Sequence, residues 1–178
     1  MTVTSAEIRT GIRLGVDVGS VRVGVARSDP AAIMAVPVRT IKRSKAVAAP
    51  DLTEIADLVV EYQPIELIVG LPVQLNGTEG LAAESVRAYV QALLERLTAR
   101  GISVPVRLVD ERLTTAVATR VLREAGRDAR SSRTVIDQAA AVVIVQDAID
   151  AERRTGTPPG MLFTSSPSTP TEGTRTTT

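Results

Sequence analysis

The hydrophobic pattern of the chain opens with three short apolar runs. Residues 14–18 and 21–26 are apolar on either side of Gly19 and Ser20, and residues 36–41 form the third run. Short apolar runs bounded by turn residues predict strands, and a tight connection between two of them predicts an antiparallel pair. We therefore expect the chain to begin with three antiparallel strands.

The pattern then changes to alternating helices and strands. Residues 51–62 place apolar side chains at the spacing of one helix face, and Pro64 ends this helix. Residues 67–69 form a run that is apolar on both faces, which is typical of a central parallel strand covered by helices. The elements expected after it are a helix over residues 79–100, a strand over 104–109, a helix from Thr114 or Thr115 to Ala125, and a helix over 134–153.

This order of elements predicts an α/β fold. Three strands followed by alternating helices and strands form a mixed sheet with helices on both of its faces. We expect this domain to occupy residues 12–154. Residues 1–11 are expected to form a flexible arm, and residues 155–178, which are rich in Thr, Ser and Pro, a disordered tail.

The composition narrows the chemistry that such a domain can perform. The 178 residues include no Cys and no His, which excludes disulfides, thiolate zinc sites and cysteine nucleophiles. A metal site must then use oxygen ligands, which suit Mg²⁺ or Mn²⁺, and Asp and Glu become the expected proton carriers. No apolar run approaches the ~20 residues of a membrane span and the chain starts without a hydrophobic signal core, so we expect a cytoplasmic protein with no membrane partner.

Two aspartates lie in apolar elements, where an unpaired charge is costly. Asp17 lies within the apolar run before Gly19, and Asp137 shares a predicted helix stripe with Ala141 and Ile144. Each has a structural alternative. Asp17 could cap the Gly19 turn, and Asp137 could be a carboxylate favoured at a helix N-terminus.

A pair of carboxylates, Asp110 and Glu111, directly follows a predicted strand. This is the end of a strand at which open α/β sheets place their ligands. Strand alternation puts Asp110 on the face of Val106 and Leu108 and Glu111 on the opposite face, so that one of the two faces a site. The alternative is that both serve the electrostatics of a turn and a helix entry.

Together, these carboxylates indicate a metal-dependent nuclease. Clustered carboxylates repel one another and are stable chiefly when a divalent cation neutralises them. Bound metal ions can activate water and stabilise the oxygens that enter and leave during phosphodiester cleavage. Such a site needs neither a histidine nor a protein nucleophile.

The distribution of basic residues suggests a nucleic-acid partner. Between residues 112 and 133 only two acids accompany the following arginines: Arg112, Arg120, Arg123, Arg127, Arg130 and Arg133. A second basic group consists of Arg39, Lys42, Arg43 and Lys45. Both groups could line the path of a phosphate backbone, or they could be ordinary solvated surface. With an aromatic content of 2%, the chain is better suited to structured nucleic acid than to stacking on splayed bases.

Four segments resemble, in this order, the successive motifs of the bacterial YqgF/RuvX family of RNase H-like proteins: LGVDVGSVRVGVARSD, IVGLP with NGT, VDERLTT and VIDQAAAVVIVQ. The resemblance extends from residue 14 to about residue 150. It implies an RNase H-like fold and a cytoplasmic nuclease that processes the 5′ end of precursor 16S ribosomal RNA. The alternative activity that it implies is a Holliday junction resolvase acting on branched DNA.

The same resemblance assigns roles by position. It implies that the catalytic metal ligands for Mg²⁺ or Mn²⁺ are Asp17, Glu111 and Asp137, with Asp110 as an accessory ligand. Arg22, Arg112 and Thr115 match phosphate-side or structural positions of the family.

Other functions stay open at this point. A resolvase of four-way junctions would need a homodimer, and the helix over residues 79–100 could supply the interface, although core packing explains its apolar face equally well. A phosphate-transfer enzyme of the sugar-kinase and actin type also uses an Asp-x-Gly turn like that of Asp17 and Gly19, but it needs two related halves. A non-catalytic nucleic-acid-binding module is the third alternative.

Overall fold

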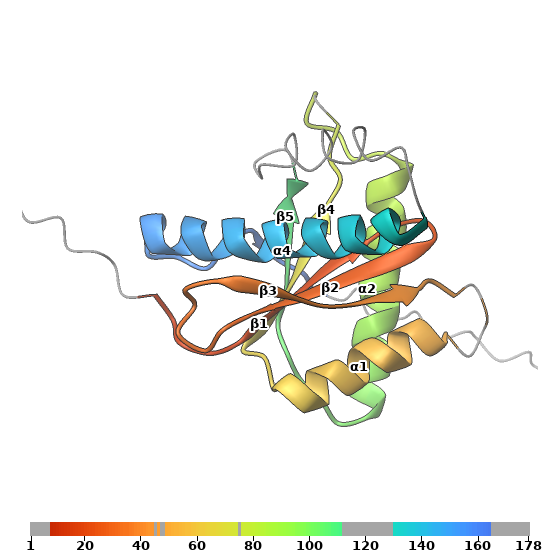
Figure 1. The fold of residues 1–178 in the computed structure, drawn as a ribbon, viewed down its shortest axis with the longest axis horizontal. Coiled ribbons are helices and arrows are strands. Elements are labelled where there is room, and N and C mark those ends of the chain that lie inside the picture. The colour runs from red at the N-terminus through yellow and green to blue at the C-terminus, as the bar shows by residue number, and fades with distance from the viewer. Residues whose placement is uncertain (1–7, 45, 47–48, 75, 112–129, 165–178) are drawn as a thin grey trace, which may run out of the picture.

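The structure is a computed structural model that describes residues 8–44, 46, 49–74, 76–111 and 130–164, with the backbone alone for residues 130–137. Its strands and helices (Figure 1) are β1 (Arg13–Val18), β2 (Arg22–Ser28), β3 (Ala35–Lys42), α1 (Pro50–Tyr62), β4 (Glu66–Leu71), α2 (Leu81–Ala99), β5 (Val106–Asp110), α4 (Arg130–Thr155) and β6 (Met161–Leu162).

The strands form one mixed sheet in the order β3-β2-β1-β4-β5-β6. β1 pairs with β2 and β2 with β3 in antiparallel orientation, whereas β4 and β5 run parallel to β1. The prediction of three antiparallel strands followed by alternating helices and strands is therefore confirmed.

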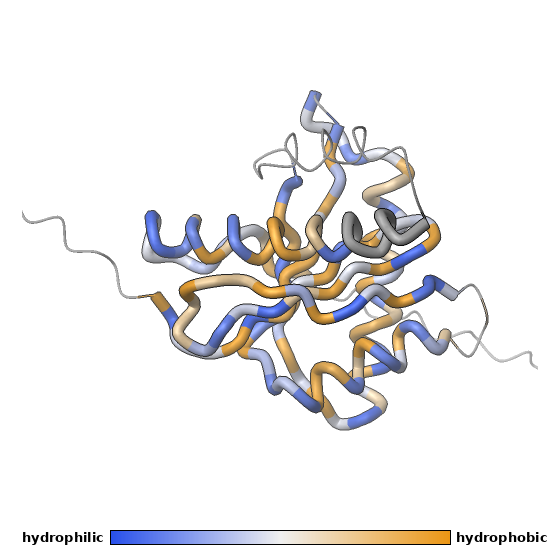
Figure 2. The backbone as a smooth tube through the Cα atoms, in the orientation of Figure 1, coloured by the Kyte–Doolittle hydropathy of each residue, from blue (hydrophilic) through white to orange (hydrophobic). Residues whose placement is uncertain are grey.

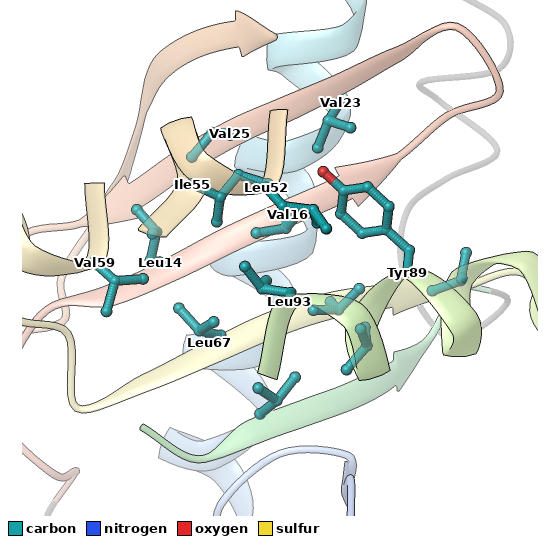
Figure 3. Packing of buried hydrophobic residues seen from close by; sticks show 14 of the residues in the cluster. Leu14, Val16, Val23, Val25, Leu52, Ile55, Val59, Leu67, Tyr89 and Leu93 are labelled. Carbon is teal, nitrogen blue, oxygen red and sulfur yellow. The ribbon is translucent and has the colours of Figure 1, made fainter. Parts of the chain in front are cut away.

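The larger core lies between the sheet and the pair of helices α1 and α2. Alternate residues of β1, β4 and β5, such as Leu14, Leu67 and Leu108, point to this side and are buried. Ile55 of α1 and Leu93 of α2 pack against them (Figure 3). The core is almost wholly aliphatic, which agrees with the apolar faces that the helical spacing predicts.

The helix α4 covers the opposite face of the sheet (Figure 1). The residues beneath it are small: a Cβ at Gly15 would collide with Val145, and Ala26 packs against Ala141 and Val145. The helix therefore lies close to β1 and β2. The hydropathy colouring shows apolar segments in the strands between the two helical layers (Figure 2).

A buried network of ion pairs ties the C-terminal end of α4 to the start of the sheet. Arg13 of β1, with no exposed surface, contacts Glu152 of α4 at 2.8 Å and Glu66 of β4 at 3.3 Å. Arg9 contacts both glutamates at 2.7 Å, and Arg107 of β5 contacts Glu66 at 2.9 Å. Buried charges require such partners, because removing one leaves its partner uncompensated.

The network also defines the direction of α4. The start of β1 meets the C-terminal end of the helix at Glu152, and Gly15 meets it earlier, at Ala141 and Val145. The helix thus runs antiparallel to β1, and its N-terminal part extends toward the carboxyl end of that strand.

The segment predicted as a tail differs from the expectation at its start. α4 continues to Thr155, and Met161 and Leu162 pair with Leu108 and Arg107 as β6. Two apolar residues are too short a run to predict a strand, and only the open edge of β5 gives them a partner. Residues 165–178 and the predicted helix from Thr114 or Thr115 to Ala125 lie outside the described residues. Among the described helices, none is both long and apolar enough to cross a membrane.

Candidate active site at the carboxyl end of the parallel strands

The parallel strands β1, β4 and β5 end side by side. The register pairs Val16 with Val69 and Gly70 with Val109, so continuing it by one residue places Asp17 beside Gly70. Asp110 pairs with Leu71, and Glu111 follows directly. Carboxylates from two strands therefore flank the end of β4.

Gly70 makes room for the Glu111 carboxylate. A Cβ at position 70 would lie 2.6 Å from Glu111 Oε1 and 2.7 Å from Ile144 Cδ1 of α4. The half-buried carboxylate thus lies over the backbone of β4, on the face that α4 covers. Any side chain at position 70 would displace it.

Asp17 faces the same layer. Gly15 of β1 contacts α4, and strand alternation puts Asp17, two residues later, on the same face as Gly15. Its side chain is half-buried. The structure therefore brings Asp17 and Glu111 to the same face, on either side of Gly70.

Asp110 lies on the other face of the sheet. It follows the alternation of Val106 and Leu108, whose side chains belong to the core beneath α1 and α2. This is the division between Asp110 and Glu111 that strand alternation predicts.

The backbone of Asp137 belongs to α4, but its side chain lies outside the described residues. Among the side chains that the structure describes, there is no group of three carboxylates able to hold a metal ion. The predicted set of Asp17, Glu111 and Asp137 includes one undescribed member and so stays a prediction.

Of the predicted nucleic-acid contacts, only Arg22 has a described side chain. It is half-buried at the first residue of β2, next to the turn after β1. Arg133 lies in α4 with its side chain undescribed. The remaining predicted arginines lie outside the described residues: Arg112, Arg120, Arg123 and Arg127.

The second basic group is divided by the structure. Arg39 is exposed and lies 3.7 Å from Glu54. Arg43, by contrast, points inward: its guanidinium donates to the carbonyl oxygen of Gly19 at 2.9 Å and to Ser85 Oγ at 3.0 Å. Both of these hydrogen bonds are to protein groups, and a role of Arg43 in binding a phosphate backbone stays a prediction.

Sequence reasoning missed Gly70, and it treated Arg43 only as a member of a basic group. A glycine that ends an otherwise apolar strand is a signal for close approach of another group, and it stands in the segment LIVGLP. Arg43 carries no comparable signal, because a basic residue after a strand is ordinary surface chemistry.

A solved structure supports the fold. RuvC of T. thermophilus, in a structure titled as its complex with a Holliday junction substrate, aligns with a TM-score of 0.51 at 14% sequence identity. The alignment covers 84% of this chain and 99% of that chain. At this identity the likeness establishes the RNase H-like fold, which confirms the predicted fold class.

Sequence comparisons establish the family. A relative from Thermobifida fusca is 52% identical over 167 residues, covering 90% of this chain and 100% of the relative. A relative from Streptomyces coelicolor is 51% identical over 154 residues, covering 86% and 88%. Both carry the name "Putative pre-16S rRNA nuclease". The family model described as "RuvX: Holliday junction resolvase" matches residues 11–151, and the chain therefore belongs to the RuvX family of nucleases.

Proposed function

We propose that the protein is a metal-dependent nuclease that cleaves phosphodiester bonds of precursor 16S ribosomal RNA near its 5′ end. In this proposal, the residues that hold Mg²⁺ or Mn²⁺ are Asp17, Glu111 and Asp137. The observation that carries this proposal is the Glu111 carboxylate held over Gly70, on the face of the sheet that Asp17 shares. Such a function belongs in the cytoplasm, where ribosomes are assembled.

The course of α4 supports the inclusion of Asp137. From Gly15 to Asp17 the strand advances about 7 Å, at about 3.4 Å per residue. The same distance along a helix corresponds to about four to five residues at 1.5 Å per residue. Gly15 lies against Ala141 and Val145 of α4. About four to five residues before this contact, toward the N-terminus of the helix, lies the region of Asp137.

The residues present fit a divalent cation. A Cβ at position 70 would fill the space that the Glu111 carboxylate occupies. Because position 70 is a glycine, a carboxylate oxygen can lie there. Carboxylate oxygens are the ligands that Mg²⁺ and Mn²⁺ prefer. When bound, such an ion lowers the pKa of water to generate the attacking nucleophile and stabilises charge on the phosphate.

The chain itself positions these groups. The backbone of β1 holds Asp17, and the absence of a side chain at Gly70 leaves the space in which the Glu111 carboxylate lies. Strand alternation puts Asp110 on the other face, so we leave this predicted accessory ligand out of the proposed set. Arg22 adds positive charge beside the turn after β1, where it can bind the substrate phosphate.

The family description favours a second substrate. The matching family model is described as a Holliday junction resolvase, so a four-way DNA junction is the alternative to precursor ribosomal RNA. Junction cleavage would also require a homodimer that presents two sites. The relatives' names favour the RNA.

The test compares the wild type with Asp17→Asn, Glu111→Gln and Asp137→Asn on a precursor 16S RNA and on a four-way DNA junction, with and without Mg²⁺ or Mn²⁺. Asp57→Asn, an exposed aspartate of α1, serves as the matched control. We expect each of the three site variants to lose cleavage by a factor of about 100 or more and to bind Mn²⁺ more weakly in calorimetry, while the control cleaves normally.

Three outcomes would contradict the proposal or change it. Wild-type cleavage in all three site variants would remove the site. Selective cleavage of the junction would make branched DNA the substrate. Binding of RNA by the wild type without cleavage in either metal would indicate a non-catalytic module.

A further inference from the structure

Arg43 joins the turn after β1 to the helix α2. Its backbone N–H donates to the carbonyl oxygen of Val21 at 2.9 Å, and its guanidinium donates to the carbonyl oxygen of Gly19 at 2.9 Å. The other arm of the guanidinium donates to Ser85 Oγ at 3.0 Å. One residue thus holds both sides of the turn and connects them to α2.

The guanidinium of Arg43 also contacts an aromatic ring. It lies over the ring of Tyr89, 5.2 Å from the ring centroid, which is a cation–π geometry. Tyr89 is buried in the core. The position of Arg43 is therefore set by a rigid aromatic platform in addition to its two hydrogen bonds.

A buried carboxylate also acts on Tyr89. Asp51, in the first turn of α1, is 1% exposed. Burial, and then the negative charge of Asp51, raise the pKa of Tyr89, whereas the positive charge of Arg43 lowers it. Asp51 and Arg43 thus act on the same hydroxyl, that of the ring on which the guanidinium lies.

The turn that Arg43 holds is the one that follows Asp17. Asp17 pairs with Gly24 of β2, the last pair of this ladder joins Val18 to Val23, and Gly19 of the turn follows Asp17 by two residues. The turn itself is tight, because the N–H of Gly19 donates to the carbonyl oxygen of Arg22 at 2.9 Å. The turn is therefore the segment that directly continues the strand end carrying Asp17.

We propose that Arg43 is a positioning residue of the nuclease site: by joining the carbonyl of Gly19 to Ser85 and Tyr89 of α2, it holds the turn that sets the position of Asp17 relative to Glu111. This inference rests on the proposed metal site. It assigns Arg43 no contact with the nucleic acid and no part in the chemistry.

The test compares Arg43→Met and Arg43→Lys with Arg100→Met. Arg100 is a suitable control because it also connects α2 to another element: it forms an ion pair of 2.6 Å with Asp57 of α1, at the helix end away from Ser85. For each variant, kcat and KM are measured on the precursor RNA, Mn²⁺ binding by calorimetry, and amide hydrogen exchange by NMR.

We expect Arg43→Met to lower kcat about tenfold, since a displacement of a fraction of an ångström in a reacting group has effects of this order. KM for the RNA should stay within a factor of about two, and Mn²⁺ binding should weaken. The amide of Gly19 should exchange faster, while that of Leu93 in the core should not change. Arg43→Lys should rescue activity only in part, because an ammonium lacks the planar fork that reaches two acceptors.

Two results would overturn the inference. One is a raised KM with unchanged kcat, together with a slope of log affinity against log salt concentration that is smaller by about one. This result would make Arg43 a ligand of the nucleic acid. Unchanged kcat together with unchanged exchange at Gly19 would show that the turn does not need it. If Arg43→Met fails to fold, Ser85→Ala removes one of the two guanidinium acceptors and is judged by the same exchange measurement.

The failure of this inference differs from failure of the proposed site. An active Arg43→Met variant beside an inactive Asp17→Asn variant would refute the positioning role alone. Full activity in Asp17→Asn would remove the site and the positioning role with it.

Discussion

The substitution Gly70→Ala tests the geometry of the site without removing any carboxylate. The new methyl would lie 2.6 Å from Glu111 Oε1, and the oxygen would have to move by about 0.8 Å to reach the 3.4 Å of ordinary contact. A misplacement of about 1 Å in a catalytic group can reduce the rate about 100-fold, which corresponds to about 2.7 kcal/mol of activation free energy. We therefore predict a loss of cleavage approaching this factor.

The same methyl would also collide with Ile144 of α4. The effect of Gly70→Ala on stability therefore has to be separated from its effect on catalysis. The methyl would lie 2.7 Å from Ile144 Cδ1, and overpacking of this kind costs about 1–3 kcal/mol of folding free energy. Ile144→Val deletes that Cδ1 atom. The double variant Gly70→Ala with Ile144→Val should thus recover stability while its cleavage stays low.

The assay measures kcat on the precursor RNA and the free energy of unfolding in urea for the wild type, both single variants and the double variant. Ile144→Val alone should cost about 1 kcal/mol and leave cleavage near the wild-type rate. A folded Gly70→Ala variant that cleaves within about threefold of the wild type would refute the reasoning, because it would show that the Glu111 carboxylate over β4 is not part of the catalytic centre.

Three further predictions concern stability. Glu152→Gln should lower the free energy of unfolding in urea by about 3 kcal/mol, because it removes an anionic partner of the buried Arg13; a loss below about 1 kcal/mol would contradict this. Burial raises the pKa of Glu152, but hydrogen bonds from Arg9 and Arg13 outweigh burial and hold this pKa below the usual 4.5. The contribution of Glu152 to the free energy of unfolding is therefore present above pH 4.5 and is lost as the pH falls below that value. Melting temperatures measured against pH should show this decline, and Glu152→Gln should flatten it. Arg87→Ala should change the free energy of unfolding by less than about 1 kcal/mol, because its ion pair with Glu79 is about one-third exposed; a larger loss in urea would mean that this pair is structural.

Much of the fold follows from local patterns. The turn at Gly19 and Ser20, the helix face over residues 51–62 and the apolar run at 67–69 predict their elements to within one or two residues. Strand alternation also separates Asp110 from Glu111 correctly. These inferences succeed because the periods of helices and strands are local properties of the backbone.

The composition and the carboxylates in apolar settings likewise point to oxygen-ligand chemistry before any coordinates are known. They identify Asp17 and Glu111 as unusual, and the structure puts both on the face beneath α4. What they leave open is how two residues so distant in sequence come to share that face. This depends on the register of β1 against β4 and of β4 against β5.

The sequence by itself determined most of the described elements, the face on which each residue of a strand lies, and the restriction of any metal site to oxygen ligands. Only the tertiary structure decided that Gly70 makes room for Glu111, that Arg43 turns inward to hold the loop after Asp17, and that Arg13 joins three elements through buried charge. The physical reason is that periodicity acts over neighbouring residues, whereas these contacts depend on strand register and helix placement, which the packing of the whole chain determines.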